Sequence, residues 1–292
     1  MNTFLTTKQA AEATEGHVKP LSADERSLRK AVARQLKSQL AEVHSRVEAG
    51  DKTSSVPSSV KKWDAAMMKE VRPVWFGLFK KGGDRALKNI LRFGKDTSRM
   101  KMFSRDMIEK AKPAAIVIPS WVEDPDVLDA LEREMFKFAH GIDQTTADML
   151  RETLINGMDE GDTIQELANS ISNLSDEWVE GWRSEMIART ETARAFTTGH
   201  IEAWRSTGVV SRKVWLASPD ACPFCLEMNG TVVELDENFF DQGDEQSVDW
   251  KDQELVMDHD YSDVNGPPLH PNCRCALVAE LEEQTQEETQ SE

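Results

Sequence analysis

The four cysteines of this 292-residue chain fall in two short clusters that have the spacing of metal ligands. The first is the turn Cys222-Pro-Phe-Cys225, which directs two thiolates at one centre. After a further 44 residues comes the second, His270-Pro-Asn-Cys273-Arg-Cys275. A structural Zn²⁺ ion takes four ligands, and five candidates are present: Cys222, Cys225, His270, Cys273 and Cys275. The spacing predicts one structural zinc ion per chain, bound either by all four cysteines or with His270 in place of Cys273 or Cys275.

Three other roles for these cysteines fit the pattern less well. Two disulfides would need an oxidising compartment, and residues 1–10 lack the basic stretch and apolar core of a secretory signal. A redox-active Cys-x-x-Cys pair is expected between a strand and a helix, whereas this pair follows the loop 217–220. A catalytic zinc ion keeps one position open for water, whereas these residues can fill the shell themselves.

Charge is distributed unevenly along the chain, whose net charge is −17. Residues 214–292 hold 20 acidic and 2 basic residues, which gives −18, and residues 61–112 hold 15 basic and 6 acidic residues, which gives +9. An acidic zinc module repels phosphate groups, so this charge disfavours a zinc-ribbon DNA-binding protein. The basic stretch is either only solvated, as such faces usually are, or makes a weak contact with DNA or an acidic partner.

No apolar run approaches the ~20 residues that cross a bilayer, so no membrane association is expected.

The helices and strands expected from the sequence predict a fold that is mainly α, with a small α+β zinc-stapled C-terminal domain that positions the cysteines. Residues 1–50 contain one amphipathic helix, which begins at the capping box of Ser22 and Glu25. The polar, Pro-containing stretch 51–60 is typical of a linker or an exposed loop, and we expect this helix to be separate from the rest of the fold.

Residues 51–120 are expected to form a basic helical region. Pro73 and the pair Gly82-Gly83 would divide it into short helices, as would Gly94. Aromatic residues would supply the buried side of these helices: Trp63, Trp75, Phe76 and Phe79. The apolar run 114–118 is either a connector or a short strand.

Residues 121–208 are expected to form the helical part of a bundle, with helix ends set by caps and glycines. A helix capped by Asp124 would end near His140 at Gly141, and another would end at Gly157. The longest helix would begin at Ser175, after a second capping box, and would end at about Thr207 with Gly208 as its C-cap.

The zinc-binding α+β module would occupy residues 209–279. Alternating and β-branched residues predict strands over 209–216 and 231–235, on either side of the Cys-x-x-Cys turn. Residues 280–292 are acidic and almost free of apolar side chains, so we expect a disordered tail there.

The long helix carries the polar run Arg189-Thr190-Glu191 shortly before the zinc module. These charges have an ordinary interpretation, because Glu185 precedes Arg189 by four residues and Arg194 follows Glu191 by three, the spacing of surface ion pairs. The alternative is that Arg189 and Glu191 brace the metal-binding loop through charge-assisted hydrogen bonds. Spacing alone leaves both open.

Taken together, these motifs resemble the C-terminal domain of the Mu F-like head morphogenesis proteins of tailed bacteriophages. The resemblance covers about residues 130–278 and rests on the order of its parts: Ala188-Arg189-Thr190-Glu191, Gly199, Trp215, Asp220, Cys222-x-x-Cys225, Gly230 and Pro267-Pro268-Leu269-His270-Pro271-Asn272-Cys273-Arg274-Cys275. It favours the bracing role of Arg189 and Glu191. The long acidic insert 236–263 departs from the family pattern.

The resemblance implies a minor head protein of the virion, made in the host cytoplasm and incorporated during procapsid assembly at the portal vertex. Its partners would be the portal protein and other head proteins, and DNA packaging or ejection would be a further role. We therefore expect a structural protein without catalytic residues or an organic cofactor. The alternatives are an enzyme or toxin-type module of the ADP-ribosyltransferase or nuclease class, and a zinc-dependent nucleic-acid-binding regulator.

Overall fold

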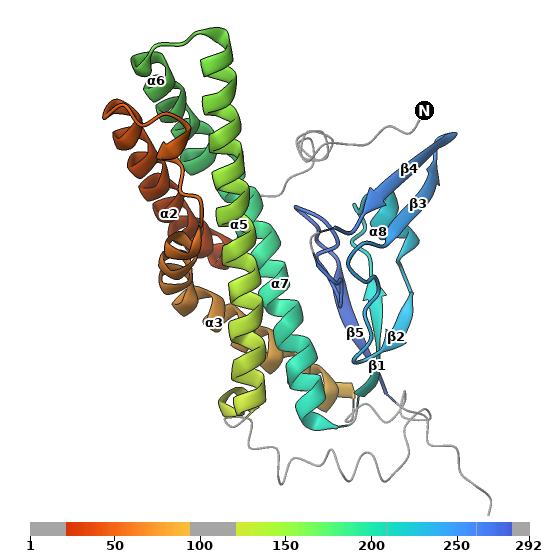
Figure 1. Ribbon diagram of the computed structural model, residues 1–292. Coiled ribbons are helices and arrows are strands. Elements are labelled where there is room, and N and C mark those ends of the chain that lie inside the picture. Colours follow the sequence, from red (N-terminus) through yellow and green to blue (C-terminus); the bar gives the residue numbers. More distant parts are fainter. Residues whose placement is uncertain (1–21, 94–120, 209, 261, 282–292) are drawn as a thin grey trace, which may run out of the picture.

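The computed structural model describes residues 22–93, 121–208, 210–260 and 262–281. Long helices pack side by side in a bundle, and a small β module lies alongside α7 (Figure 1). The helices of the bundle are α2 (Ala23–Glu48), α3 (Lys61–Phe93), α5 (Pro125–Glu160), α6 (Ile164–Ser175) and α7 (Trp182–Thr207). Short 3₁₀ turns lie at Thr53–Ser55 and Trp121–Glu123.

Strand β1 (Val210–Leu216) is the centre of the β module and pairs antiparallel with β2 (Val232–Glu234) and β5 (Ala276–Leu281). The short helix α8 (Pro223–Glu227) lies between β1 and β2 in the chain. A separate hairpin consists of β3 (Glu245–Trp250) and β4 (Gln253–Asp258). The prediction of a mainly α fold with a small α+β region at the C-terminal side is confirmed.

Helix α2 begins at the predicted capping box. The Glu25 amide donates to Ser22 Oγ over 3.2 Å, and the Ser22 amide donates to Glu25 Oε2 over 2.6 Å. The apolar face of α2 is fully buried against α3, α6 and α7, with Leu28, Val32 and Leu36 at its centre. The expectation that this helix is separate from the rest is therefore wrong, because its apolar stripe needs a partner surface.

Helix α3 is continuous, so the predicted breaks at Pro73 and Gly82-Gly83 are wrong; Gly94 lies outside the described residues. The buried residues Met67, Val71 and Trp75 form a stripe that continues on both sides of Pro73 in the sequence. Tertiary packing of this kind outweighs the loss of helix stability that proline causes. Three of the four aromatic residues expected to be buried are so, namely Trp63, Trp75 and Phe79, while Phe76 is half-buried.

The glycines of α3 serve contact with α7 instead of ending the helix. A Cβ atom added at Gly82 would lie 2.5 Å from the carbonyl oxygen of Phe196 on α7. On the facing helix, a Cβ added at Gly199 would overlap the carbonyl oxygen of Phe79. The two backbones approach so closely here that a side chain larger than hydrogen does not fit.

Helix α5 is also continuous, and the helix end predicted at Gly141 is wrong. Nothing lies within 4 Å of a Cβ built there, and the buried face continues past it from Ala139 to Ala147 and Leu150. His140 is consequently in the middle of a helix and not near its end. By contrast, the long helix predicted from Ser175 is interrupted by a π-helical turn, Asp176–Glu180, and by extended backbone at Gly181.

Two further expectations concern residues 114–118 and 280–292. The apolar run 114–118 lies outside the described residues. The predicted tail begins too early, because Glu280 and Leu281 still belong to β5 and Glu280 pairs with Arg212 of β1.

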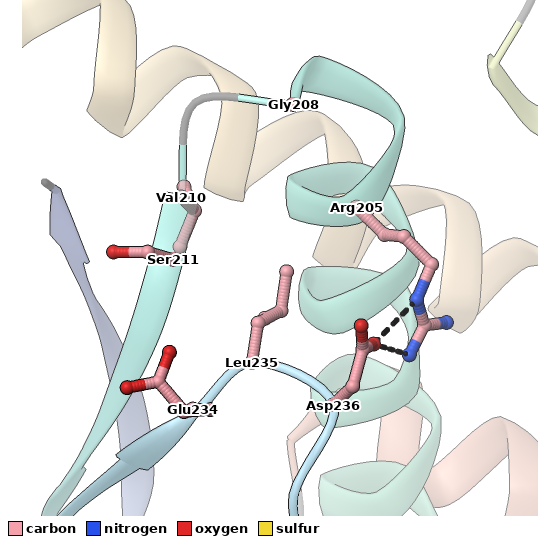
Figure 2. Close-up of a pocket in the computed structure, with 7 residues that line it drawn as sticks. All are labelled: Arg205, Gly208, Val210, Ser211, Glu234, Leu235 and Asp236. Atoms are coloured by element: carbon pink, nitrogen blue, oxygen red, sulfur yellow. Dashed lines mark hydrogen bonds and ion pairs between the residues drawn. The ribbon is translucent and has the colours of Figure 1, made fainter.

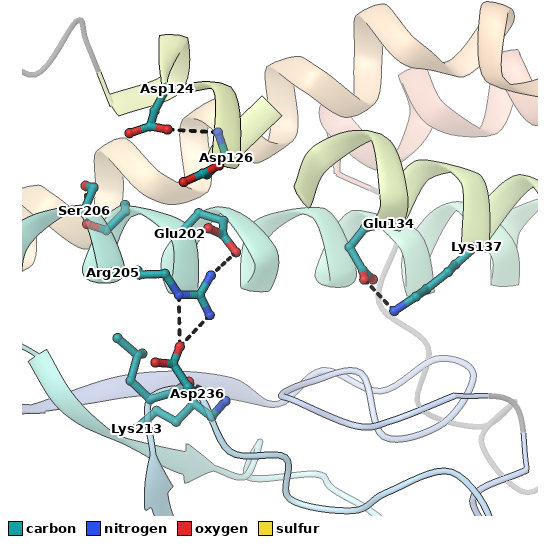
Figure 3. Close-up of polar contacts among 11 residues, drawn as sticks. Asp124, Asp126, Glu134, Lys137, Glu202, Arg205, Ser206, Lys213 and Asp236 are labelled. Carbon is teal, nitrogen blue, oxygen red and sulfur yellow. Dashed lines mark hydrogen bonds and ion pairs between the residues drawn. The ribbon is translucent and has the colours of Figure 1, made fainter. Parts of the chain in front are cut away.

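The β module is attached to the end of α7 by an exposed polar contact (Figures 2 and 3). Arg205 of α7 donates from Nε and Nη2 to Asp236 Oδ1 over 2.9 and 2.7 Å, and it also pairs with Glu202. Nearby, Lys213 is 1% exposed and donates to the carbonyl oxygen of Leu235. Burial lowers the pKa of Lys213 to about 8, since water no longer solvates its charge. No described helix is long and apolar enough to span a membrane.

The close contact between α3 and α7 predicts that replacing glycine by alanine has opposite effects on stability at Gly199 and at Gly141. Gly199→Ala should destabilise the protein by about 1–3 kcal/mol, because the new methyl group overlaps the α3 backbone. Gly141→Ala is the matched control in an open position and should stabilise by roughly 0.5–1 kcal/mol through helix propensity. Urea unfolding followed by circular dichroism measures both, and a stabilised Gly199→Ala protein would contradict the close contact.

Candidate metal centre

The register of the sheet brings the two cysteine clusters together. Leu216, the last residue of β1, pairs with Ala276, the first residue of β5. The loop that follows β1 and the loop that precedes β5 therefore begin side by side at one end of the sheet. These two loops carry the two clusters, although 44 residues lie between Cys225 and His270 in the sequence.

The first loop is shaped by α8 and by a tight return to the sheet. Cys222 is the N-cap of α8, Pro223 occupies its first position, and Cys225 follows within its single turn. The chain then turns back at Gly230, whose φ of +87° favours glycine. The Gly230 amide donates to the carbonyl oxygen of Trp215 over 2.8 Å, which closes the loop onto β1.

The second loop is a turn immediately before β5. The Cys273 amide donates to the carbonyl oxygen of His270 over 3.1 Å, and Asn272 adopts a φ of +66°. Asparagine tolerates this left-handed conformation better than most residues. The turn directs the side chains of His270 and Cys273 towards the first loop.

All five predicted ligands meet at this point. The Nε2 atom of His270 lies 3.1 Å from Cys222 Sγ and 3.3 Å from Cys225 Sγ, and Cys225 Sγ lies 3.7 Å from Cys273 Sγ. The ligand atoms form two groups that share Cys225, one with Cys222 and His270 and one with Cys273 and Cys275, each within 4.8 Å. None of the four cysteines forms a disulfide. The arrangement could hold a metal ion, and four of the five residues would suffice.

The imidazole of His270 is oriented for such a role. Its Nδ1 atom lies 2.8 Å from the carbonyl oxygen of Pro271, so Nδ1 carries the proton and donates it. The lone pair of Nε2 then faces the two sulfur atoms. Metal-binding histidines are commonly fixed in this way by a backbone carbonyl group.

Charge at the cluster supports the same interpretation. A hydrogen bond from Cys225 lowers the pKa of the Cys222 and Cys275 thiols, whereas the pKa of Cys225 is raised, first by its hydrogen bond to Cys222. Full deprotonation would crowd negative charges in a buried space, and a dication offsets this cost. The donor set of sulfur and imidazole nitrogen fits a metal such as zinc.

The polar run of α7 touches the second loop at Asn272. Arg189 donates from Nη1 to Asn272 Oδ1 over 2.8 Å, and the Asn272 amide donates to Thr190 Oγ1 over 3.0 Å. Glu191 instead accepts from Arg194 Nε over 3.1 Å. Arg189 and Glu191 are only 4% and 6% exposed, so the alternative of a solvated helix face does not describe either side chain. Bracing by Arg189 stays a prediction with a direct contact to support it, whereas the described ion pair of Glu191 is with Arg194 on its own helix.

Glu25 of α2 also belongs to this region, and sequence reasoning missed it. Its Oε1 atom lies 3.4 Å from Arg274 of the second loop and 4.0 Å from Arg189 Nε. Burial and Arg274 lower the pKa of Arg189, and Glu25 opposes this effect. The capping box identified Glu25 as a helix-start residue, but no local pattern indicates that it also accepts two arginines from distant segments.

The acidic insert is structured and covers the metal loops. Strands β3 and β4 are joined by Lys251 and Asp252, whose φ values of 52° and 63° are those of a two-residue hairpin turn. From β3, Gln246 Nε2 donates to the carbonyl oxygen of Phe224 in α8 over 3.1 Å, and Val248 joins the core around the cysteines. The side chains of residues 245–258 alternate between the two faces of the hairpin, and this alternation is the sequence signal from which the hairpin could have been predicted.

The other histidines do not join this site. His200 is half-buried and stacks on Trp204, and desolvation lowers its pKa to about 4, which keeps the ring neutral. His259 stacks on Phe240 with ring centroids 4.1 Å apart. Within the described ranges, groups of possible metal ligands were found only at the cysteines.

The Glu25 contact predicts a specific loss of stability. Glu25→Gln keeps an oxygen that accepts from the Ser22 amide but removes the charge that faces Arg189 and Arg274. We expect a loss of about 1–3 kcal/mol, because two arginines at a largely buried site lose their carboxylate partner. The control is Glu70→Gln in the exposed pair with Arg34, which should change stability by under about 0.5 kcal/mol. Equal melting temperatures for both variants in thermal unfolding would contradict the contact.

Comparison with known proteins gives one match. Residues 148–278 match the family model described as Phage Mu protein F like protein. No curated protein and no solved structure matches the chain. The matched segment contains α7, both cysteine loops and the insert. It points to a bacteriophage protein of head morphogenesis and to association with the virion. Residues 148–278 of the chain are therefore similar to the family of Phage Mu F-like proteins.

Proposed function

We propose that this chain is a minor head protein that acts during procapsid assembly at the portal vertex of a tailed bacteriophage. The observation that carries the proposal is the family match over residues 148–278, within which the polar helix and both cysteine loops meet at one site. A role in DNA packaging or ejection is compatible with this position but has no separate support from the described residues.

We further propose that the metal is Zn²⁺ with a structural role. Cys222 and Cys225 would hold it from the first loop, and two of His270, Cys273 and Cys275 would hold it from the second. Zinc favours tetrahedral sites of cysteine and histidine, and a bound ion would fasten the two loops at one end of the sheet to each other. A closed shell supports a non-enzymatic protein, because five candidate ligands leave no position that must be filled by water.

The proposed docking partners are the portal protein and other head proteins. Support comes from the exposed basic side chains of α3, which include Lys69, Arg85 and Lys88 and face away from the core. Basic side chains attract acidic protein surfaces or DNA, and this attraction weakens with salt. The same face could make the weak contact with DNA.

Zinc binding has a direct test in the purified, reduced protein. Metal analysis should give about one zinc ion per chain, since structural zinc contributes on the order of 10 kcal/mol to folding. Cys225→Ser should remove the metal and melt the β module while the helices persist. His270→Ala and Cys275→Ser, compared side by side, would reveal the fourth ligand, because the variant that retains metal has lost a residue outside the shell. Well-folded, metal-free wild-type protein would refute the proposal.

Head assembly is tested by charge reversal on the surface of α3. The double variant Lys69→Glu and Lys88→Glu leaves the buried contacts of α3 in place and should reduce the number of copies found in purified proheads. The matched control is Lys251→Glu, an exposed lysine in the hairpin of the β module. Quantitative mass spectrometry of proheads measures the copy number, and normal incorporation of the double variant would exclude α3 as the docking face.

A further inference from the structure

Three polar side chains meet inside the helical bundle, far from the cysteines in the sequence. They come from three helices: Gln39 from α2, Asp64 from α3 and Asp143 from α5, which are 2%, 3% and 0% exposed. Gln39 Nε2 donates to Asp143 Oδ1 over 2.7 Å. His140, one turn before Asp143 on α5, lies with Nδ1 3.0 Å from Asp64 Oδ2 at the rim of the cluster.

Each of the two carboxyl groups has one buried oxygen that receives no hydrogen among the described residues. These atoms are Asp64 Oδ1 and Asp143 Oδ2. Asp64 raises the pKa of Asp143 both by its charge and by a hydrogen bond between the two carboxyl groups. Two ionised carboxylates cannot form such a bond, because both would only accept. One proton between them satisfies both buried oxygens.

We propose that Asp64 and Asp143 share one proton, and that its release above neutral pH loosens the contact of α5 with α2 and α3. The bundle then carries a pH-sensitive device that is independent of the metal centre and of the proposed function. Like charges in close proximity inside a protein raise the cost of ionising both groups.

The surroundings of the pair offer limited compensation for a second negative charge. From α5, a protonated His140 offsets the charge of Asp64, although its side chain is 48% exposed. From α7, Arg183 faces Asp143 but donates to Thr146 Oγ1 and lies over the Trp178 ring. Gln39 from α2 is neutral, and the residues that α6 buries are apolar: Leu167, Ala168 and Ile171.

The direction of the pH effect follows from the protonation of Asp143. Burial, opposed by Gln39 and reinforced by Asp64, raises the pKa of Asp143 from 3.8 to about 7. The folded chain therefore holds a proton that the unfolded chain has lost between these values. The resulting stability is fully present below about pH 3.8 and is lost as the pH rises through about 7.

Asp143→Asn tests the proposal in the full chain. The asparagine amide can donate to Asp64 permanently while its oxygen still accepts from Gln39. The ratio of the wild-type folding equilibrium constant to that of Asp143→Asn should fall by at least about tenfold between pH 5 and pH 8. Taking this ratio at one zinc concentration cancels titration at the cysteines. Asp148→Asn, at an exposed position on the same helix, should track the wild type. A ratio that stays constant with pH would overturn the proposal.

A second measurement decides the matter even if Asp143→Asn does not fold. The ¹³C chemical shift of the Asp143 carboxyl group in the wild-type protein should titrate with a midpoint above pH 6. Amide hydrogen exchange in residues 139–147, corrected for its intrinsic pH dependence, should accelerate through the same range. A midpoint below about pH 4.5 would show that Asp143 is ionised at neutral pH and that no proton is shared.

Discussion

The close contact between the backbones of α3 and α7 at Gly199 determines where the other parts of the structure lie. Because glycine removes the side chain at the crossing, the two helices share a long apolar interface, and 15 of the 26 residues of α7 are buried. One side of α7 faces the bundle. Its other side carries Arg189 and Thr190 to the second cysteine loop, so one helix positions both the core and the metal centre.

The metal centre depends on strand register in a similar way. A one-residue slip of β5 against β1 would turn the side chains of β5 to the opposite face and separate the loops that carry Cys222 and Cys275. Buried Leu277 on β5, which pairs with buried Trp215 on β1, makes such a slip costly, since Leu277 would leave the core. The hydrophobic pattern of the strands thus positions ligands that are themselves polar.

The N-terminal helix is part of the same body as the family-like region. Glu25 places a negative charge between Arg189 and Arg274, one from the polar helix and one from the Cys-Arg-Cys turn. Ions at largely buried sites need partners, because water cannot solvate them there. A segment outside the matched residues therefore completes an electrostatic arrangement within them. This connection gives the first helix a structural reason to remain docked.

The sequence by itself determined the local features: the capping box at Ser22, the strand patterns around the Cys-x-x-Cys turn and the five clustered ligand candidates. Each depends on residues within a few positions of one another, where spacing limits geometry directly. It also indicated the mainly helical fold and the family. Helix ends at Gly82-Gly83 and Gly141 were predicted wrongly, because glycine weakens a helix locally but tertiary packing can hold it.

Only the tertiary structure decided what depends on contacts between distant segments. It joined Glu25 to the metal loops, ordered the acidic insert as a hairpin, and brought Asp64 and Asp143 together inside the bundle. Sequence gives no measure of burial for a charged residue, and a carboxylate on a helix is usually exposed. The physical reason is that burial and neighbouring charges set the pKa and the partners of a charged side chain, and both of these exist only in the folded chain.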